Sequence, residues 1–290
     1  MDSLVKQKLE IIQNHLDTYL QTKYPETIYE SMRYSMFAGG KRIRAMLLFS
    51  VCESLGGNET VALTFACAIE MIHTYSLIHD DLPCMDNDDY RRGKLTNHKV
   101  YGEAIALLAG DGLLNLAYET MSEACLHSGS KEALMAMNMI AKAAGVTGMV
   151  GGQVVDLLSE NKKIDRKELE YIHEHKTGAL FYASVMAGAV LANASQADLA
   201  HLEMFSHHFG LAFQIKDDIL DVIGDSKRMG KSIGSDAKND KATYTTLVGL
   251  EEAQQYHDRL LEDAFVALQS VRAKDTFLYD YACSLANRNV

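Results

Sequence analysis

Residues 72–93 read IHTYSLIHDDLPCMDNDDYRRG, and the rest of the chain is best understood from this stretch. It begins as an apolar helical run, places five Asp in the ten positions from Asp80 to Asp89, and then turns basic at Arg91 and Arg92. Carboxylates crowded behind a core-like segment need cations to neutralise them. Mg²⁺ suits this pattern because it takes one or two carboxylates and completes its shell with substrate phosphates and water. The alternative is an acidic surface loop.

The spacing of the acidic residues predicts a break in the helix. Asp80 and Asp86 are six residues apart, which places them about 120° out of register on a continuous helix. Pro83 also removes a backbone donor and clashes with the preceding turn. We therefore expect the chain to loop out after Asp81 and to bring Asp86 back toward Asp80.

A second acidic cluster follows about 130 residues later in the sequence. Asp217 and Asp221 are four residues apart, so they share one face of a helix, with Asp218 beside them. A helix of this kind offers two carboxylates to one cation.

A basic segment, GGKRIR at residues 39–44, predicts an anion site. Gly40 lets a backbone approach a ligand, and Lys41 and Arg44 supply positive charge. The alternative is a solvated helix start.

Composition limits the possible functions. Among 290 residues, 48% are hydrophobic and 23% are charged, with a net charge of −11. Such an acidic surface argues against nucleic-acid or anionic-membrane binding. Five Cys without a CxxC pair favour free thiols in a reducing compartment, and the N-terminus shows no secretory signal, so we expect a cytoplasmic protein without stable membrane association.

Helical periodicity and only two Pro predict an all-α fold, a single large helical bundle over residues 1–290 with a central cavity between two Asp-rich helices. Asp111, among leucines, is expected to be a costly buried charge unless it is paired. A polar, Gly-rich segment at 224–241 is expected to be a mobile loop. Helices are expected over residues 3–22, 28–36, 45–55, 60–79, 103–126, 130–146, 148–159, 166–194, 196–223, 251–268 and 276–287.

Two acidic clusters that face each other across an apolar cavity suit a prenyl diphosphate. The carboxylates would hold Mg²⁺ on the diphosphate, and the apolar helix faces would line a pocket for the hydrocarbon tail. Metal ions neutralise the leaving group, so that its C–O bond can ionise to an allylic cation. The site must also exclude water.

The chain resembles the trans-isoprenyl diphosphate synthases, and within them the bacterial farnesyl diphosphate synthases. Leu95, Lys216 and Tyr90 depart from the usual family residues without removing a ligand. The resemblance rests on eight motifs in family order: GGKRIR (39–44), HTYSLIHDDLPCMDNDDYRRG (73–93), TNHKVYGEA (96–104), LLAGDGLLN (107–115), GGQVVD (151–156), HKTGAL (175–180), QIKDDILDV (214–222) and GKSIGSDA (230–237).

This resemblance implies an activity and a role for each matching residue. It implies head-to-tail condensation of isopentenyl diphosphate with dimethylallyl and geranyl diphosphate, by a homodimer with three Mg²⁺ in each active site. The implied Mg²⁺ ligands are Asp80, Asp81, Asp86, Asp217, Asp218 and Asp221; Arg91, Lys176, Lys231 and Lys241 would contact the allylic diphosphate; Gly40, Lys41, Arg44, His73 and Arg92 would bind isopentenyl diphosphate; and Thr177 and Gln214 would present dipoles to the carbocation. Lys231 and Lys241 are expected to lie in a lid that orders over diphosphate.

Tyr75, five residues before Asp80, is the residue that the resemblance implies for the control of product length. Helix geometry places Tyr75 about 7.5 Å along the axis and about 140° around it, so spacing alone does not show that the ring faces the pocket. In the family that the chain resembles, an aromatic residue at this position forms the floor of the pocket. With the small Ser76 above it, Tyr75 implies a product of fifteen carbons, farnesyl diphosphate. The alternative is a tyrosine packed in the core.

Other functions remain open at this stage. A longer-chain, geranylgeranyl-type synthase has a similar motif loop, but Tyr75 argues against it. A non-catalytic subunit of a heteromeric synthase should have lost carboxylates, whereas both clusters are complete. A terpene cyclase also ionises a prenyl diphosphate but has no need of the basic segment at residues 39–44.

Overall fold

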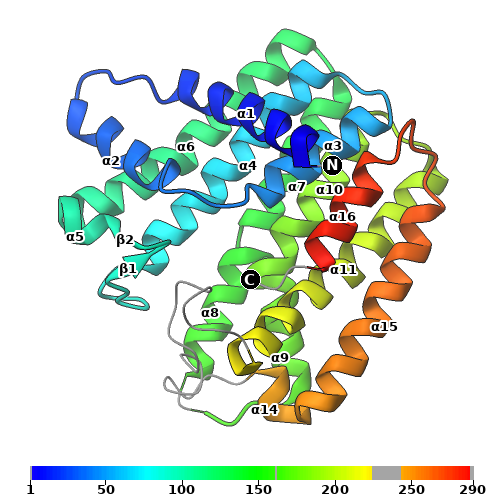
Figure 1. Ribbon diagram of the computed structural model, residues 1–290. Coiled ribbons are helices and arrows are strands. Elements are labelled where there is room, and N and C mark those ends of the chain that lie inside the picture. Colours follow the sequence, from blue (N-terminus) through cyan, green and yellow to red (C-terminus); the bar gives the residue numbers. More distant parts are fainter. Residues whose placement is uncertain (1, 161, 224–242, 288–290) are drawn as a thin grey trace.

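The computed structural model describes residues 2–160, 162–223 and 243–287, and in this part of the chain nearly all regular structure is helical (Figure 1). The predicted all-α architecture is confirmed. The helices are α1 (Asp2–Tyr19), α2 (Glu26–Met36), α3 (Ile43–Ser54), α4 (Glu59–Asp80), α5 (Asn97–Tyr101), α6 (Glu103–Ser128), α7 (Lys131–Ala144), α8 (Met149–Ser159), α9 (Arg166–Ile172), the π-helix η1 (His173–Gly178), α10 (Ala179–Leu191), α11 (Gln196–Ile223), α14 (Tyr244–Val248), α15 (Leu250–Gln269) and α16 (Phe277–Ala286).

Helix α4 lies at the centre of the bundle, between α3 and α6. Its side chains are buried on nearly all sides, as expected for a helix that is apolar all round. It begins at Asn58, whose side-chain oxygen accepts hydrogen bonds from the backbone N–H groups of Thr60 and Val61 at 3.0 and 3.2 Å. A buried ion pair between Arg42 and Glu70, 3.4 Å apart, joins the start of α3 to α4.

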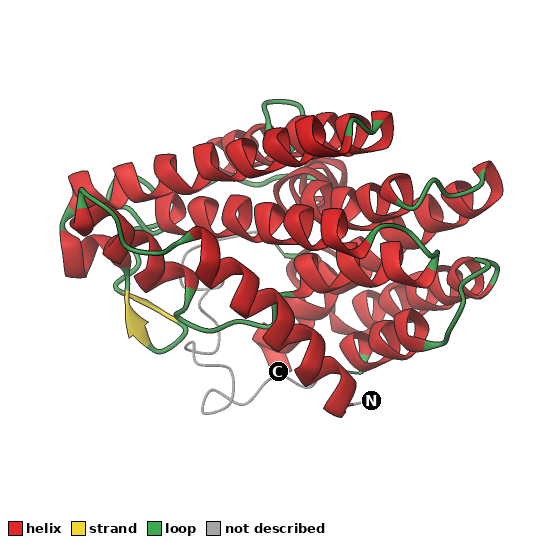
Figure 2. Ribbon diagram, turned by 90° about the horizontal axis from the view of Figure 1, so that it is seen from above, coloured by secondary structure: helices red, strands yellow, loops and turns green. Residues whose placement is uncertain are grey.

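The remaining long helices surround this centre. Helix α10 packs against α3, α7 and α11, and α11 packs against α15, which runs along one side of the molecule (Figure 1). Gly188 permits the α10–α3 contact, because a Cβ there would lie only 2.4 Å from the Leu48 carbonyl oxygen. Viewed from above, many of the long helices run in similar directions (Figure 2).

The structure corrects three details of the sequence prediction. The helix expected over residues 166–194 is divided into α9, η1 and α10, so the prediction of one continuous helix was wrong. Residues Tyr90–Arg91 (β1) and Lys94–Leu95 (β2) form a short antiparallel hairpin that the sequence did not predict. It projects at one end of the bundle (Figure 2). Asp111 is exposed and lies 3.8 Å from the His79 ring, so its carboxylate is paired rather than buried among the leucines and the condition for a costly charge does not arise.

Among the described residues, two segments are long and apolar enough to cross a membrane by length and composition, Glu59–Asp80 and Lys131–Ser159. In the first, 67% of the most apolar window is buried inside the fold, and a turn divides the second between α7 and α8. Core helices pass the same test, so these segments are weak evidence for a membrane span.

Candidate active site

The first acidic cluster lies where α4 ends. Asp80 is the last helical residue, and Asp81 caps the helix. The chain then loops through Pro83 and returns, so that the backbone N–H of Asp86 donates to the carbonyl oxygen of Asp80 at 2.9 Å. The predicted loop and return are therefore confirmed.

Adjacent carboxylates in this cluster face different surroundings. Asp80 accepts a hydrogen bond from Gln153 Nε2 at 2.7 Å and borders the large cavity described below. Asp81 is buried and accepts from Arg91 Nε at 2.7 and 2.9 Å. Burial raises the pKa of Asp81, although the Arg91 hydrogen bond and charge oppose that rise. Asp80 thus borders the cavity, whereas Asp81 forms an ion pair with Arg91.

Lys176 approaches the cluster from η1. Its Nζ lies 2.6 Å from Asp156 Oδ2 and 3.9 Å from Asp80 Oδ2. A π-helix widens the backbone turn, and such segments are frequent at functional sites. Gly152 on α8 allows the close approach, because a Cβ there would lie 2.1 Å from the backbone nitrogen of Lys176.

The motif GGQVVD at residues 151–156 therefore has a physical explanation. Gly152 leaves room for the backbone of η1. The Gln153 side chain donates a hydrogen bond to Asp80, and Asp156 accepts one from Lys176. The sequence alone did not reveal these roles of Gln153 and Asp156. The available signal for this site was a helix that carries Gly152, Gln153 and Asp156 and is followed by Lys176, 20 residues after Asp156.

Positive charge also gathers around His73, another residue that borders the large cavity. Arg44 borders the large cavity, and its Nε is buried with no hydrogen-bond acceptor among the described residues. Burial, reinforced by the charges of Arg44 and Arg92, lowers the pKa of His73 well below its usual range, so His73 is neutral at pH 7. An anion bound beside His73 would give the buried Arg44 Nε an acceptor.

The residues of the basic segment at 39–44 have different surroundings, which the sequence did not predict. Arg92 donates to the carbonyl oxygen of Gly39, and its guanidinium lies where a Cβ of Gly40 would be, 2.6 Å from Cζ. Gly40 also has φ +116°, a conformation that L side chains rarely adopt. Arg42 turns inward to Glu70, and Lys41 is exposed.

A cavity of about 410 Å³ extends below Asp80. Tyr75 and Ser76 both border it, together with apolar side chains of α8 such as Val154. Tyr75 is 7% exposed, and its ring meets the His79 ring edge-on at 5.5 Å. His79 in turn occupies the space left by Gly110, where a Cβ would lie 2.1 Å from Nε2. Helix projection alone did not show whether Tyr75 faces a pocket. In the structure, Tyr75 and Ser76 border the same cavity.

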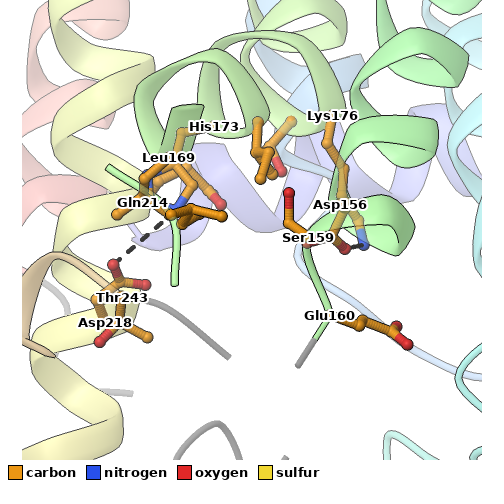
Figure 3. Close-up of a pocket in the computed structure, with 12 residues that line it drawn as sticks. Asp156, Ser159, Glu160, Leu169, His173, Lys176, Gln214, Asp218 and Thr243 are labelled. Carbon is orange, nitrogen blue, oxygen red and sulfur yellow. Dashed lines mark hydrogen bonds and ion pairs between the residues drawn. The ribbon is translucent and has the colours of Figure 1, made fainter. Parts of the chain in front are cut away.

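A second cavity of about 170 Å³ lies beside the first, and Lys176 and Thr177 line both. Gln214 and Asp218 of α11 enter it from the opposite side, with His173 of η1 (Figure 3). Asp218 Oδ2 accepts from the backbone N–H of Tyr244 at 2.8 Å and lies 3.9 Å from His173 Nε2. The two acidic clusters thus border adjoining cavities.

The predicted metal ligands differ in their exposure. Asp217 is exposed, Asp86 and Asp221 are half-buried, and Asp218 is buried. Within the described ranges no three His, Cys, Asp or Glu side chains already surround one point. The donors are nevertheless hard carboxylate oxygens at a site with unsatisfied Arg44, which fits Mg²⁺ that completes its shell with diphosphate oxygens. Lys231 and Lys241, and the predicted lid, lie outside the described residues.

The chain is similar in sequence and fold to known proteins. The polyprenyl synthetase family matches residues 25–279. The chain is 44% identical over 291 residues to the farnesyl diphosphate synthase of Bacillus subtilis (strain 168), covering 100% of this chain and 98% of that one. It is 45% identical over 284 residues to the geranylgeranyl diphosphate synthase of Cyanophora paradoxa, covering 98% and 95%. The solved geranyltransferase of Helicobacter pylori, complexed with magnesium and isoprenyl diphosphate, has a TM-score of 0.84 at 31% identity, covering 98% of this chain and 96% of that one.

The fold and the site define a helical isoprenoid synthase. The chain belongs to the polyprenyl synthetase family. It is a trans-prenyltransferase that elongates prenyl diphosphates, and its family binds Mg²⁺.

Proposed function

We propose that this enzyme makes (2E,6E)-farnesyl diphosphate from isopentenyl diphosphate with dimethylallyl and then geranyl diphosphate. The observation that carries the proposal is the position of Tyr75, which borders the cavity below Asp80. A tail that grows downward from a diphosphate at Asp80 would meet this buried ring. Ser76 borders the same cavity and leaves room above the ring.

The chain's own residues divide the work of binding. Asp80 and Asp86 from the first cluster, with Asp217 and Asp221 from the second, would hold Mg²⁺ on the allylic diphosphate, and we propose three ions. Bound Mg²⁺ supplies charge neutralisation of the leaving diphosphate. Lys176 would exchange its contact with Asp156 for the diphosphate, and Arg91 would add a further charge. Lys231 and Lys241, from outside the described residues, would complete this set.

Isopentenyl diphosphate would bind on the basic side. Arg44, Arg92 and neutral His73 would hold its phosphates, with Lys41 and the backbone at Gly40 beside them. Its double bond would then face the ionising carbon. Thr177 and Gln214 would present their dipoles to the allylic cation in a water-poor cavity.

A geranylgeranyl diphosphate synthase is the second candidate, because identity to the Cyanophora paradoxa enzyme is similar. A non-catalytic subunit is the less favoured alternative, since both acidic clusters are complete. We also propose a homodimer in the cytoplasm without stable membrane association, in accord with the five free cysteines.

A product-length assay tests the proposal. Purified protein would be incubated with Mg²⁺, dimethylallyl diphosphate and labelled isopentenyl diphosphate, and the dephosphorylated products separated by chain length. A dominant C15 product is expected. C20 would keep the chemistry and reject the Tyr75 floor, and absence of product would favour the non-catalytic subunit.

A further inference from the structure

Tyr244 connects the second acidic cluster to a part of the fold outside the reaction site. Its side chain is fully buried, and it is the first residue of α14. Its backbone N–H donates to Asp218 at 2.8 Å, and its hydroxyl donates to Glu170 Oε1 on α9 at 2.6 Å. One residue thus joins α11, α9 and α14.

The partner of the hydroxyl is itself fixed. Arg166 Nε donates to Glu170 Oε1 at 2.9 Å, and its guanidinium lies 4.6 Å from the centre of the Tyr256 ring. Burial tends to raise the pKa of Glu170, but the hydrogen bonds from Tyr244 and Arg166 outweigh it and hold the pKa below its usual range. Glu170 therefore remains a charged acceptor for the tyrosine hydroxyl.

Asp218 is the residue of the second acidic cluster that contacts Tyr244 directly. It lies about 100° around the helix from Asp217, and it is 9% exposed whereas Asp217 is exposed. The Nε2 atom of the nearby His173 ring lies 3.9 Å from the Asp218 carboxylate, beyond hydrogen-bond distance. The Tyr244 N–H therefore links this buried carboxylate to α14 at 2.8 Å.

We propose that Tyr244 is a positioning residue of the second acidic cluster. Its hydroxyl bond to Glu170 fixes α14, and its N–H then fixes Asp218 and the end of α11 that presents Asp217 and Asp221. Asp218 acts in this scheme as an anchor for the cluster. The inference rests on the proposed role of these carboxylates in metal binding.

The test measures metal binding directly and does not depend on turnover. Mn²⁺ would replace Mg²⁺ as a spectroscopic probe, and its binding to the full chain with inorganic diphosphate would be followed by electron paramagnetic resonance. Tyr244→Phe removes only the hydroxyl, so we expect three- to tenfold weaker Mn²⁺ binding. The half-saturating Mg²⁺ concentration in the assay should rise more than kcat falls.

Tyr182→Phe is the matched control. The Tyr182 hydroxyl also donates to a glutamate, Glu203, at 3.3 Å, but that pair joins α10 to α11 away from both acidic clusters. Mn²⁺ affinity should be unchanged in this variant. Equal Mn²⁺ affinity in the Tyr244 and Tyr182 variants would overturn the proposal, including the case where Tyr244→Phe lowers only the melting temperature.

Asp218 provides a second, independent comparison. Asp218→Asn retains an oxygen acceptor for the Tyr244 N–H, so it should lose less Mn²⁺ affinity than Asp218→Ala. If Asp218 were a direct ligand, both variants would lose as much as Asp217→Asn, and the anchoring role would be rejected. Should Tyr244→Phe fail to fold, Glu170→Gln against Glu170→Ala makes the same comparison, because only the glutamine keeps an acceptor.

Failure of the proposed function would have a different signature. A wild-type chain without elongated product but with Mn²⁺ and diphosphate binding would reject the synthase assignment. The affinity differences between the variants would still decide whether Tyr244 positions the cluster.

Discussion

Asp80 and Asp81 show how far neighbouring residues of one type can diverge. Asp80 borders the cavity and accepts from Gln153, whereas Asp81 is 3% exposed and paired with Arg91. The sequence predicted that this cluster would cap an apolar helix and fold back at Asp86. It could not separate the two carboxylates, because Asp80 meets Gln153 of α8, which is 73 residues away, and Asp81 meets Arg91 of a hairpin that the sequence did not predict.

Substitution of these two residues should therefore have different consequences. Asp80→Ala should lower kcat/KM by about 10²–10³, the scale of losing one electrostatic stabiliser, with a small change in stability. Asp81→Ala leaves Arg91 without its buried partner and should lower the free energy of unfolding by about 2–4 kcal/mol, somewhat less than a fully buried pair because Arg91 keeps some access to water. Urea unfolding without Mg²⁺ and steady-state kinetics check both. Equal losses of unfolding free energy in the Asp80→Ala and Asp81→Ala variants would contradict these separate roles.

Tyr75 determines product length if its ring is the floor of the tail cavity. Tyr75→Ala removes that ring and should shift the main product beyond fifteen carbons, measured by chain-length separation. Tyr75→Phe retains the ring and should keep the wild-type length. An unchanged product in Tyr75→Ala would mean that the ring only packs in the core.

Helix α8 is the element that assembles the site, through Gly152, Gln153 and Asp156. Its close contact with η1 is the feature that the sequence predicted least well. Gly152 makes the contact possible, because a Cβ there would lie 2.1 Å from the backbone nitrogen of Lys176. The π-helix itself was missed, because HEHKTG has no local signal that distinguishes a wide turn from an α-helical one, and the tertiary contact with α8 decides it. The short helices α5 and α14 were missed for a similar reason, since five residues carry too little periodicity.

Gly152→Ala tests whether this contact supports catalysis. The new methyl group would meet the backbone of Lys176, so α8 and η1 must separate, at a cost of about 1–3 kcal/mol. Lys176 should then lie farther from Asp80, and kcat/KM should fall at least tenfold. Thermal unfolding and kinetics measure the two effects.

Gly210→Ala is the matched control on α11. A Cβ there meets only Phe181 at 3.5 Å, an ordinary contact, so stability should be unchanged or slightly higher because Ala favours helix. A similar loss of activity in both variants would show that the α8–η1 contact has no special role.

At the scale of the whole molecule, much of the architecture could be predicted from composition and periodicity. A long helix at residues 196–223 and the central apolar helix ending at the first acidic cluster lie where the sequence placed them. The arrangement of the two cavities could not be predicted, because it depends on which faces of α4, α8, η1 and α11 meet. A net charge of −11 also requires cations wherever a polyanion binds, and the structure places Arg44, Lys176 and Arg92 near the acidic clusters.

This charge balance predicts that the protein's response to Mg²⁺ and to diphosphate is cooperative. Carboxylates at Asp80 and Asp217 repel diphosphate alone, and Mg²⁺ alone lacks the phosphate oxygens that complete its shell. Together they should raise the free energy of unfolding by about 2.7 kcal/mol at one hundred times the dissociation constant, and each alone should have a much smaller effect. Thermal unfolding with Mg²⁺, inorganic diphosphate, both, and both with excess EDTA measures this dependence, and Asp80→Ala should reduce the joint effect. Equal stabilisation by diphosphate alone would show that the basic residues suffice to bind it, and the carboxylates would then need another explanation.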